Sequence, residues 1–291
     1  MLTISECPIC GSTSLEDEMS VKDHSVSKET FTIIKCSSCG LRITSPRPLD
    51  SDLGRYYESE DYVSHSDTNK GIINYLYQQV KSITLRKKET LMSSFNNSKT
   101  LLDIGCGTGD FLLYCKDKGW KVSGLEPDIK AREKAQSKGL ENVQDINQLF
   151  SISNQKYGMI TMWHVLEHVA DLNKYMKTLH SLLEENGRLI IAVPNPDSAD
   201  AKNYKEDWAA LDVPRHLFHF SKKNIHDLAV KHNFTVDNIK PMVFDSYYVS
   251  MLSEKYKKGS FLNAMINGLV SNLKGSSSKN HSSLIYILSK N

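Results

Sequence analysis

The 291-residue sequence predicts an α/β fold preceded by a small cysteine-rich segment. From residue 100 onward, short apolar segments of strand length alternate with helical segments, a pattern typical of a largely parallel sheet covered by helices. A glycine-rich turn, Gly105-Cys106-Gly107-Thr108-Gly109, joins the first of these strands to a helix. Within residues 1–48, four of the six cysteines form two Cys-x-x-Cys pairs.

These pairs repeat one local design, because a glycine follows the second cysteine each time. A Cys-x-x-Cys turn directs two thiolates to one point, and the glycine lets backbone amides approach the sulfur. Two such turns supply the four ligands of a closed, tetrahedral structural zinc site. Redox chemistry or disulfides are the alternative for one pair, but the repetition favours zinc. We therefore expect a zinc ribbon over residues 1–48, with Zn²⁺ held by Cys7, Cys10, Cys36 and Cys39.

Residues 49–98 are expected to form a linker and an amphipathic helix. Two prolines, Pro46 and Pro48, interrupt any helix at the end of the ribbon. Between residues 71 and 95, apolar side chains recur at near-helical spacing, which predicts a long helix laid against the sheet. A tyrosine-rich stretch precedes it, in which Tyr56, Tyr57 and Tyr62 are candidates for covering a ligand site, although packing is the commoner role of such residues.

The glycine turn lies between a strand and a helix in residues 100–112. Because glycine has no Cβ, a ligand can approach the backbone closely there. Asp103 comes just before the turn, where a carboxylate attracts an ammonium group and repels a pyrophosphate. In the dinucleotide fingerprint, the rival interpretation, the third glycine comes one position later, and Asp110 stands in that place here. The turn therefore favours a cationic cofactor without phosphate, such as S-adenosylmethionine.

Two further acids follow at places that suit the rest of an adenosyl ligand. The second expected strand, Lys121–Leu125, is followed by Glu126, about twenty residues past the glycines, where a carboxylate usually holds a ribose diol. After a helical segment, Asp145 can accept from an adenine amine while Ile146 packs on the ring. Solvated loop carboxylates are the alternative, and for Asp145 alone the two interpretations are evenly matched. Together with the turn, these residues indicate an adenosyl cofactor site.

Histidines and an acid follow the fourth expected strand, Tyr157–Trp163, in the order His164, Glu167, His168. The carboxyl ends of strands face the ligand crevice in a doubly wound sheet, so we expect these side chains beside the methyl donor. If a helix begins here, all three share one face. A second cluster, residues 212–221 with His216, lies between the fifth expected strand and the next helix and can fold over the same crevice.

After the sixth expected strand, residues 245–275 are expected to form a helical insertion. Two helices, at 245–256 and 260–273, would make a lid or an acceptor wall, in which Tyr247 and Tyr248 are candidate contacts. Simple packing of the lid is an equally good explanation for these tyrosines. The apolar segment 284–288 would then insert antiparallel between its neighbours and complete the sheet.

From Thr100 to the C-terminus the sequence resembles the class I S-adenosylmethionine-dependent methyltransferases. The similarity rests on residues 103–109, Glu126, residues 145–146, residues 163–169 and residues 187–195. It implies a seven-stranded Rossmann-like methyltransferase sheet in residues 99–291, with the cofactor over the carboxyl ends of the first strands. The cofactor-binding residues that it implies are Asp103, Gly105, Gly107, Gly109, Glu126, Asp145, Ile146 and His164.

The N-terminal segment is similar to a zinc-ribbon branch of these enzymes, which includes sugar C-methyltransferases. A histidine in the His-Leu-x-x-Phe-Ser segment is the base in those enzymes, which implies His216 as general base and His168 as its partner or a substrate contact. The acid and tyrosine that flank the base there are Arg215 and Val213 here. These departures weaken the implied role of His216. The sugar C-methyltransferases also carry a further large C-terminal domain that this shorter sequence lacks, so the sugar substrate is not carried over.

A second interpretation gives Glu167, His168 and His216 to a divalent metal ion. Residues 164–168 resemble the Glu-x-x-Glu-His metal element of some quinol O-methyltransferases and small-RNA end methyltransferases. The first acid of that element is His164 here, so Mg²⁺ would lose a favoured oxygen ligand. The sequence leaves the base, the metal and a buried structural role open for these side chains.

Composition narrows the function further. The net charge of +2 and the pI near 8.1 do not predict a strong nucleic-acid or membrane surface. Neither a twenty-residue apolar run nor a signal-peptide core occurs, so we expect no membrane span and a reducing, cytoplasmic location.

The leading function is methylation of oxygen or carbon in a small molecule, such as a sugar, quinol or secondary metabolite. An RNA methyltransferase with a nucleic-acid-binding ribbon is the alternative, and a catalytically silent scaffold is the third. The acceptor and the oligomeric state stay open.

Overall fold

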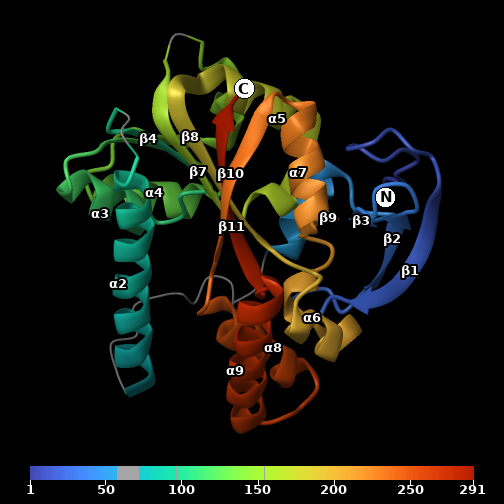
Figure 1. Ribbon diagram of the computed structural model, residues 1–291. Helices are drawn as coiled ribbons and strands as arrows, with labels where there is room; N and C mark the ends of the chain where they lie inside the picture. Colours follow the sequence, from blue (N-terminus) through green and yellow to red (C-terminus); the bar gives the residue numbers. More distant parts are fainter. Residues whose placement is uncertain (58–71, 96–97, 154) are drawn as a thin grey trace.

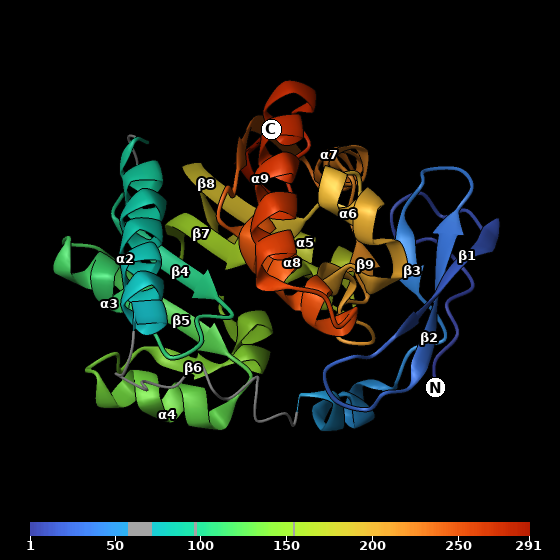
Figure 2. The same ribbon diagram turned by 90° about the horizontal axis from the view of Figure 1, so that it is seen from below.

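The computed structural model describes residues 1–57, 72–95, 98–153 and 155–291. These residues form two sheets, a central one of seven strands and an N-terminal one of four. Figure 1 shows the N-terminal sheet on the right, the central sheet in the middle and helix α2 (Ile72–Ser93) on the left. The view from below in Figure 2 keeps this order. The expected ligand-site tyrosine Tyr62 lies outside the described residues.

The central sheet has the strand order β10-β11-β8-β7-β4-β5-β6. Only β11 among these strands runs antiparallel, because it pairs antiparallel with both β10 and β8. This confirms the predicted seven-stranded Rossmann-like sheet with an inserted antiparallel last strand. The strands are β4 (Thr100–Ile104), β5 (Lys121–Glu126), β6 (Val143–Asp145), β7 (Tyr157–Trp163), β8 (Leu183–Pro194), β10 (Phe234–Pro241) and β11 (Ser283–Lys290).

Each face of the central sheet carries its own apolar core. Successive residues of a strand point to opposite faces, so Leu101 packs in one cluster and Leu102 in the other. The cluster of Leu101 includes Met92 of α2. The cluster of Leu102 includes Met176 of α5 (Leu172–Leu182) and Leu228 of α7 (Lys222–Lys231). Both faces are thus covered by helices, which explains why the strands are almost continuously apolar.

The helices match most of the expected positions. They are α2 (Ile72–Ser93), α3 (Asp110–Asp117), α4 (Ile129–Ser137), α5 (Leu172–Leu182), α6 (Ala199–Tyr204), α7 (Lys222–Lys231), α8 (Asp245–Tyr256) and α9 (Phe261–Ser278). The 3₁₀ helices are η1 (Asp50–Tyr56), η2 (Ile146–Ser151), η3 (Leu166–His168), η4 (Lys205–Asp207) and η5 (Ala209–Leu211). None of the described helices combines the length and the apolar composition needed to span a membrane.

Two expectations for the helices need correction. The sequence from His164 to His168 does not form a regular helix, because His164 has a left-handed backbone with φ of 57° and only the 3₁₀ turn η3 follows. Helix α9 extends to Ser278, five residues beyond its expected end, so Gly275 lies inside the helix. That glycine packs tightly against His281, where an added Cβ would come within 3.0 Å of the ring.

The N-terminal sheet contains the cysteine-rich ribbon and one strand from much later in the chain. Its strands are β1 (Leu15–Lys22), β2 (Thr30–Cys36), β3 (Arg42–Thr44) and β9 (Phe218–His219). Strand β9 lies next to His216 and pairs antiparallel with β3. Cys7, Cys39 and Leu41 of the ribbon are buried in the same apolar cluster as the central sheet. The ribbon is therefore packed onto the rest of the protein, and the expected boundaries at residues 48 and 98 stay predictions.

Candidate active site

The acids expected to hold the cofactor lie at the carboxyl edge of neighbouring parallel strands. Asp103 is in β4, Glu126 ends β5 and Asp145 ends β6, with Glu126 and Asp145 directly paired in register. Asp103 is buried, and its Oδ1 accepts a hydrogen bond of 2.6 Å from the Thr161 hydroxyl. Burial raises the pKa of Asp103 to about 7, because the charged form loses its hydration. Such a carboxylate is well suited to bind a cation.

The glycine turn between β4 and α3 follows the same edge. Gly105 has φ of 72°, and a Cβ there would lie 2.5 Å from the Val165 side chain, so close packing excludes other residues. At Gly107 a Cβ would meet no atom within 4 Å, so this part of the turn borders open space. The Gly107 N–H donates to Oε2 of Glu126 over 2.8 Å, which connects the turn to the end of β5.

Both carboxylate oxygens of Asp145 already have partners within the protein. Its Oδ1 accepts from the backbone N–H of Asn147 and thereby caps η2. Its Oδ2 lies 2.9 Å from the Arg132 guanidinium. Ile146 is half-buried beside the core. The adenine contacts expected for Asp145 and Ile146 stay predictions, with Arg132 as an additional residue at this end of the site.

His164, the residue after β7, forms two ion pairs, and one of them reaches helix α8. Its Nε2 lies 2.9 Å from Oδ2 of Asp245, the first residue of α8, and its Nδ1 lies 3.4 Å from Oε1 of Glu167. Burial alone would lower the pKa of His164, but the two carboxylates raise it to about 10. The protonated imidazole therefore holds the start of α8 to the end of β7, and a cofactor contact of His164 stays a prediction.

Glu167, His168 and His216 come together beside this ion pair. One ligand atom from each lies within 4.8 Å of the others. The two imidazole rings pack edge to face, with their centroids 4.6 Å apart. The Glu167 carboxylate is buried, and within the described residues neither oxygen accepts a well-aligned hydrogen bond. Nearby histidines nevertheless keep the pKa of Glu167 low in spite of burial. The two candidate catalytic histidines thus lie beside the buried carboxylate of Glu167.

Hydrogen bonds to carbonyl groups orient the two imidazoles. Nδ1 of His216 lies 2.8 Å from the Ala210 carbonyl oxygen, and Nδ1 of His168 lies 3.0 Å from that of Arg215. A carbonyl only accepts, so each Nδ1 carries the proton and each neutral ring keeps its lone pair on Nε2. The hydroxyl of Tyr57 is also 3.2 Å from Nδ1 of His168, so this tyrosine lies beside the two imidazoles.

The departure at Arg215 has a structural explanation. Its guanidinium is fully buried and binds Asp212 within its own loop and Asp23 in the ribbon, at 2.6 and 3.0 Å. It also donates to the Tyr56 carbonyl oxygen over 2.8 Å. Although burial opposes ionisation, bonds from Arg215 and Ser27 lower the pKa of Asp23 to about 2. Arg215 therefore joins the loop of His216 to the ribbon.

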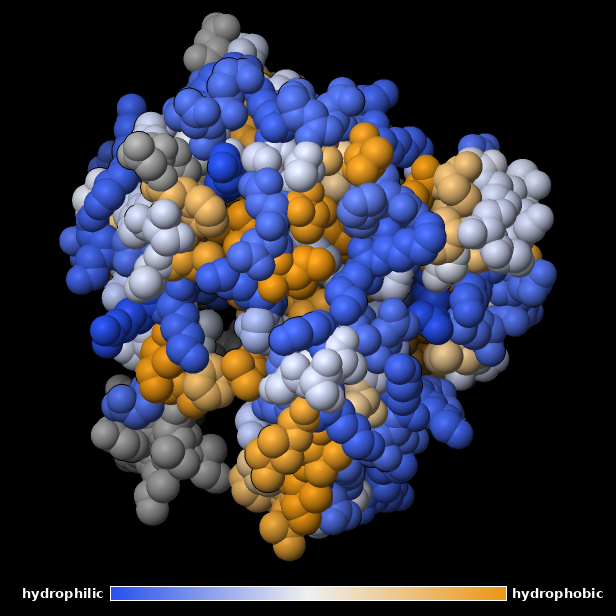
Figure 3. Space-filling view, viewed as in Figure 1, coloured by the Kyte–Doolittle hydropathy of each residue, from blue (hydrophilic) through white to orange (hydrophobic). Residues whose placement is uncertain are grey.

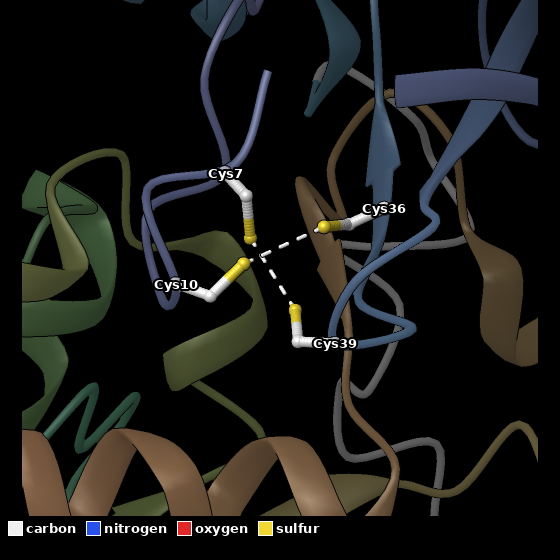
Figure 4. Close-up of side chains that lie close together, drawn as sticks. All are labelled: Cys7, Cys10, Cys36 and Cys39. Atoms are coloured by element: carbon white, nitrogen blue, oxygen red, sulfur yellow. Dashed lines mark hydrogen bonds between the residues drawn. The ribbon is translucent and has the colours of Figure 1, made fainter. Parts of the chain in front are cut away.

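The four ribbon cysteines converge as expected from their spacing (Figure 4). Sγ of Cys7 is 3.5 Å from that of Cys39, and Sγ of Cys10 is 3.6 Å from that of Cys36. None of the four is in a disulfide. Four thiolates at about 2.3 Å from one zinc ion stand about 3.8 Å apart. The arrangement fits a tetrahedral S₄ zinc centre.

Sequence reasoning missed three residues of the site. Asp245 is separated from His164 by 81 positions, and only its place at the start of a helix marks it. The Lys88 ammonium lies 4.1 Å from the ring centre of Trp163, but the residue stands in a lysine-rich helix without distinguishing signal. Thr44 at the end of β3 donates to the carbonyl oxygen of His216, a contact that depends on the docking of the ribbon.

Comparison with known proteins identifies the central domain. Residues 76–239, more than half of the chain, match the model of a methyltransferase-domain family. A ubiquinone biosynthesis O-methyltransferase of Rickettsia bellii is 23% identical over 206 residues, which cover 65% of this chain and 84% of that protein.

Solved structures show the same fold. An O-methyltransferase of a polyketide synthase from Brevibacillus brevis, in complex with S-adenosyl-L-homocysteine, has a TM-score of 0.52 and 15% identity over 75% of both chains. Magnesium protoporphyrin IX methyltransferase from Synechocystis has a TM-score of 0.52 and 15% identity over 83% of this chain and all of that one. Together with the family match, this confirms the enzyme class expected from the sequence. The chain belongs to the methyltransferase-domain family and is a class I S-adenosylmethionine-dependent methyltransferase.

Proposed function

We propose that this protein methylates an oxygen or carbon atom of a small molecule and that His216 removes the proton of the acceptor. The relatives and structural neighbours named above include O-methyltransferases of small molecules, which supports this substrate class. The position of the histidines beside the carboxyl edge of the sheet supports the role of the base. Methyl transfer from a sulfonium needs little more than alignment of the acceptor and removal of its proton.

The cofactor site in this proposal uses the carboxyl edge of β4, β5 and β6. Asp103 would bind the ammonium of the methionine part, because burial strips hydration from its carboxylate and raises its pKa to about 7, and a cation would restore the charged form. Glu126 would hold the ribose diol, and Asp145 with Ile146 would contact the adenine. The open space at Gly107 fits a ligand that passes close to the backbone. When bound, S-adenosylmethionine supplies the electrophilic methyl group.

The orientation of the His216 ring is the observation that carries the proposal. Because Nδ1–H is bound to the Ala210 carbonyl, Nε2 is the atom that can accept a proton. The imidazolium that forms would be stabilised by Asp212, whose Oδ2 lies 3.9 Å from Nε2, and by the nearby Glu167. His168 would orient the acceptor, since its own Nε2 is also left unprotonated in the neutral ring.

An isotope-labelled methyl donor tests this function. The enzyme is incubated with S-adenosylmethionine and metabolite extracts, and the molecule that gains the label identifies the acceptor. With that acceptor, His216→Asn should reduce turnover by roughly 10²- to 10⁴-fold while the affinity for S-adenosylhomocysteine is kept. The matched control is His226→Asn, which changes an exposed histidine on α7. Unchanged turnover of His216→Asn would reject the role of base.

A divalent metal ion is the second candidate occupant of this cluster. The buried Glu167 carboxylate without a well-aligned donor, together with two imidazole Nε2 atoms, is a two-histidine, one-carboxylate ligand set. Such an ion would act as a Lewis acid that acidifies an acceptor hydroxyl. Calorimetry with Mn²⁺ distinguishes the two interpretations. Binding that is lost in Glu167→Gln favours the metal, whereas full turnover in the presence of a chelator favours the base.

We also propose that the ribbon cysteines hold one structural zinc ion. All four positions of a tetrahedral ion would be taken by sulfur, which leaves no place for water or substrate. The ribbon therefore contributes to the enzyme by packing against the methyltransferase domain, not by taking part in the chemistry. Its knuckles contact α5 and α7, where Asn224 donates to the Cys39 carbonyl oxygen and Asn173 donates to that of Pro8.

A further inference from the structure

Helix α9 is built with its apolar side facing outward. Its buried residues are small or polar, namely Ala264, Gly268, Ser271, Asn272 and Gly275. Its large apolar residues are exposed, with exposed fractions of 70% for Phe261, 68% for Leu262, 50% for Ile266, 49% for Leu269 and 63% for Leu273. A helix on the surface of a globular protein normally shows the opposite arrangement.

This orientation is fixed by specific contacts of the inner face. The Ser271 hydroxyl donates to buried Asp200 over 2.6 Å, and the Asn272 amide donates to the Val243 carbonyl oxygen over 2.9 Å. At Gly268 an added Cβ would lie 2.7 Å from the ring of Tyr247 in α8. Close packing through small residues is typical of helix pairs in membranes. Rotating α9 would break these bonds, so its apolar side is held outward.

The exposed side forms one continuous apolar surface. Leu262, Ile266, Leu269 and Leu273 follow each other at helical spacing along α9. Met251 and Tyr248 of α8 are exposed as well. Figure 3 shows an apolar patch over the α8–α9 hairpin, at the lower end of the molecule. We name this the α9 outer face, composed of Phe261, Leu262, Ile266, Leu269, Val270 and Leu273.

The exposed charged residues of the α8–α9 hairpin are all lysines. Lys257 and Lys258 are exposed at the tip of the hairpin, and Lys274 and Lys279 are exposed at its other end. The acids of residues 245–279 are turned inward, because Glu254 is buried and Asp245 is paired with His164. A second copy of the chain would bring lysines against lysines. An anionic lipid surface, in contrast, would bury the apolar stripe and attract the lysines.

We propose that the α9 outer face docks on membranes that contain anionic lipids. Leucine and phenylalanine side chains would enter the boundary between head groups and acyl chains, and the lysines would bind phosphate groups. The hairpin begins at Asp245, which is ion-paired with His164. It therefore connects the docking face with the candidate active site. The proposal concerns this surface and does not depend on which acceptor is methylated.

Sedimentation with lipid vesicles tests the proposal on the full chain. The protein should bind vesicles of phosphatidylcholine with phosphatidylglycerol, and much less those of phosphatidylcholine alone. Leu262→Glu with Leu269→Glu should weaken binding about tenfold or more, because charges replace apolar anchors. Lys257→Gln with Lys258→Gln should weaken it and reduce its salt dependence.

A matched double variant controls for the added charge. Val230→Glu with Ile239→Glu changes two exposed apolar residues far from α9 in sequence, on α7 and β10, and should leave vesicle binding intact. Affinity for S-adenosylhomocysteine should be equal in all variants, which shows that they are folded. The proposal is overturned if anionic vesicles do not bind the protein. It is also overturned if the protein forms a dimer that Leu262→Glu with Leu269→Glu dissociates while vesicle binding is unchanged.

Discussion

The Thr44 hydroxyl donates a hydrogen bond of 2.7 Å to the carbonyl oxygen of His216, and both residues are buried. Thr44 ends β3 in the ribbon, and the Thr44 backbone N–H also donates to the Leu217 carbonyl oxygen over 3.0 Å. Its hydroxyl is 3.2 Å from Nε2 of His219 as well. The cysteine-rich ribbon is thus in direct contact with the loop that carries the proposed base.

Replacing Thr44 by valine should weaken the loop that carries His216 without affecting the binding of the cofactor. The substitution keeps the shape of the side chain and leaves the His216 carbonyl without this donor. We expect the free energy of unfolding to fall by about 1–3 kcal/mol. Turnover should fall roughly tenfold or more, since the base is displaced. Denaturant titration and steady-state kinetics measure the two effects.

The affinity of Thr44→Val for S-adenosylhomocysteine should not change, because the cofactor acids lie on β4, β5 and β6. Thr13→Val, at an exposed position of the same ribbon, is the control and should behave like the wild type. If Thr44→Val lost stability but kept full turnover, the bond would be structural only.

Loss of zinc should impair turnover through the same contact. In Cys39→Ser one of four sulfur ligands is missing, so we expect the zinc content, measured by mass spectrometry, to fall well below one ion per chain. Turnover should fall with it, because the ribbon no longer holds the loop. Cys115→Ala, which changes a buried cysteine of α3 outside the cluster, should keep its zinc. A wild-type protein that binds no zinc would contradict the proposal.

The sequence predicts the central sheet and the cysteine cluster well, and the reasons are local. Strand β4, the glycine turn and α3 are encoded by adjacent residues, so hydrophobic pattern and glycine positions are sufficient. The spacing of Cys7 and Cys10, repeated in Cys36 and Cys39, determines that each pair can share an ion. Parallel strands then bring their carboxyl ends to one edge, which collects Asp103 and Glu126.

Features that depend on tertiary packing could not be predicted. Arg215 pairs with Asp23 although 192 positions separate them, and nothing in the sequence near either residue indicates this ion pair. A helix beginning at His164 would place His164, Glu167 and His168 on one face, but His164 has a left-handed backbone and pairs with Asp245 instead. Hydrophobic periodicity also could not predict that the apolar side of α9 points outward. A helical pattern shows that one face is apolar, but not whether that face is buried or exposed.

The pair of His164 and Asp245 should make stability depend on pH in the alkaline range. The pKa of His164 is raised to about 10, above the usual 6.5 of an unfolded chain. Its contribution to stability is therefore complete below pH about 6.5 and is lost as the pH rises through 10. The difference in unfolding free energy between the wild type and Asp245→Asn should shrink as pH rises. Asp197→Asn, at a half-buried position outside this pair, serves as control. A constant difference between pH 6 and 10.5 would show that the ion pair with α8 does not stabilise the fold.

Binding of the cofactor should depend on the ionisation of Asp103. Its pKa is raised to about 7 by burial, and an ammonium group favours the carboxylate form. Affinity for S-adenosylhomocysteine, measured by calorimetry, should therefore fall about tenfold for each pH unit below 7 and level off above it. In Asp103→Asn the affinity should be low and independent of pH over this range, whereas Asp117→Asn in α3 should keep the profile of the wild type. An affinity of the wild type that stays constant from pH 5 to 8 would mean that Asp103 does not face the ammonium group, and the assignment of the glycine turn to the methionine end of the cofactor would have to be given up.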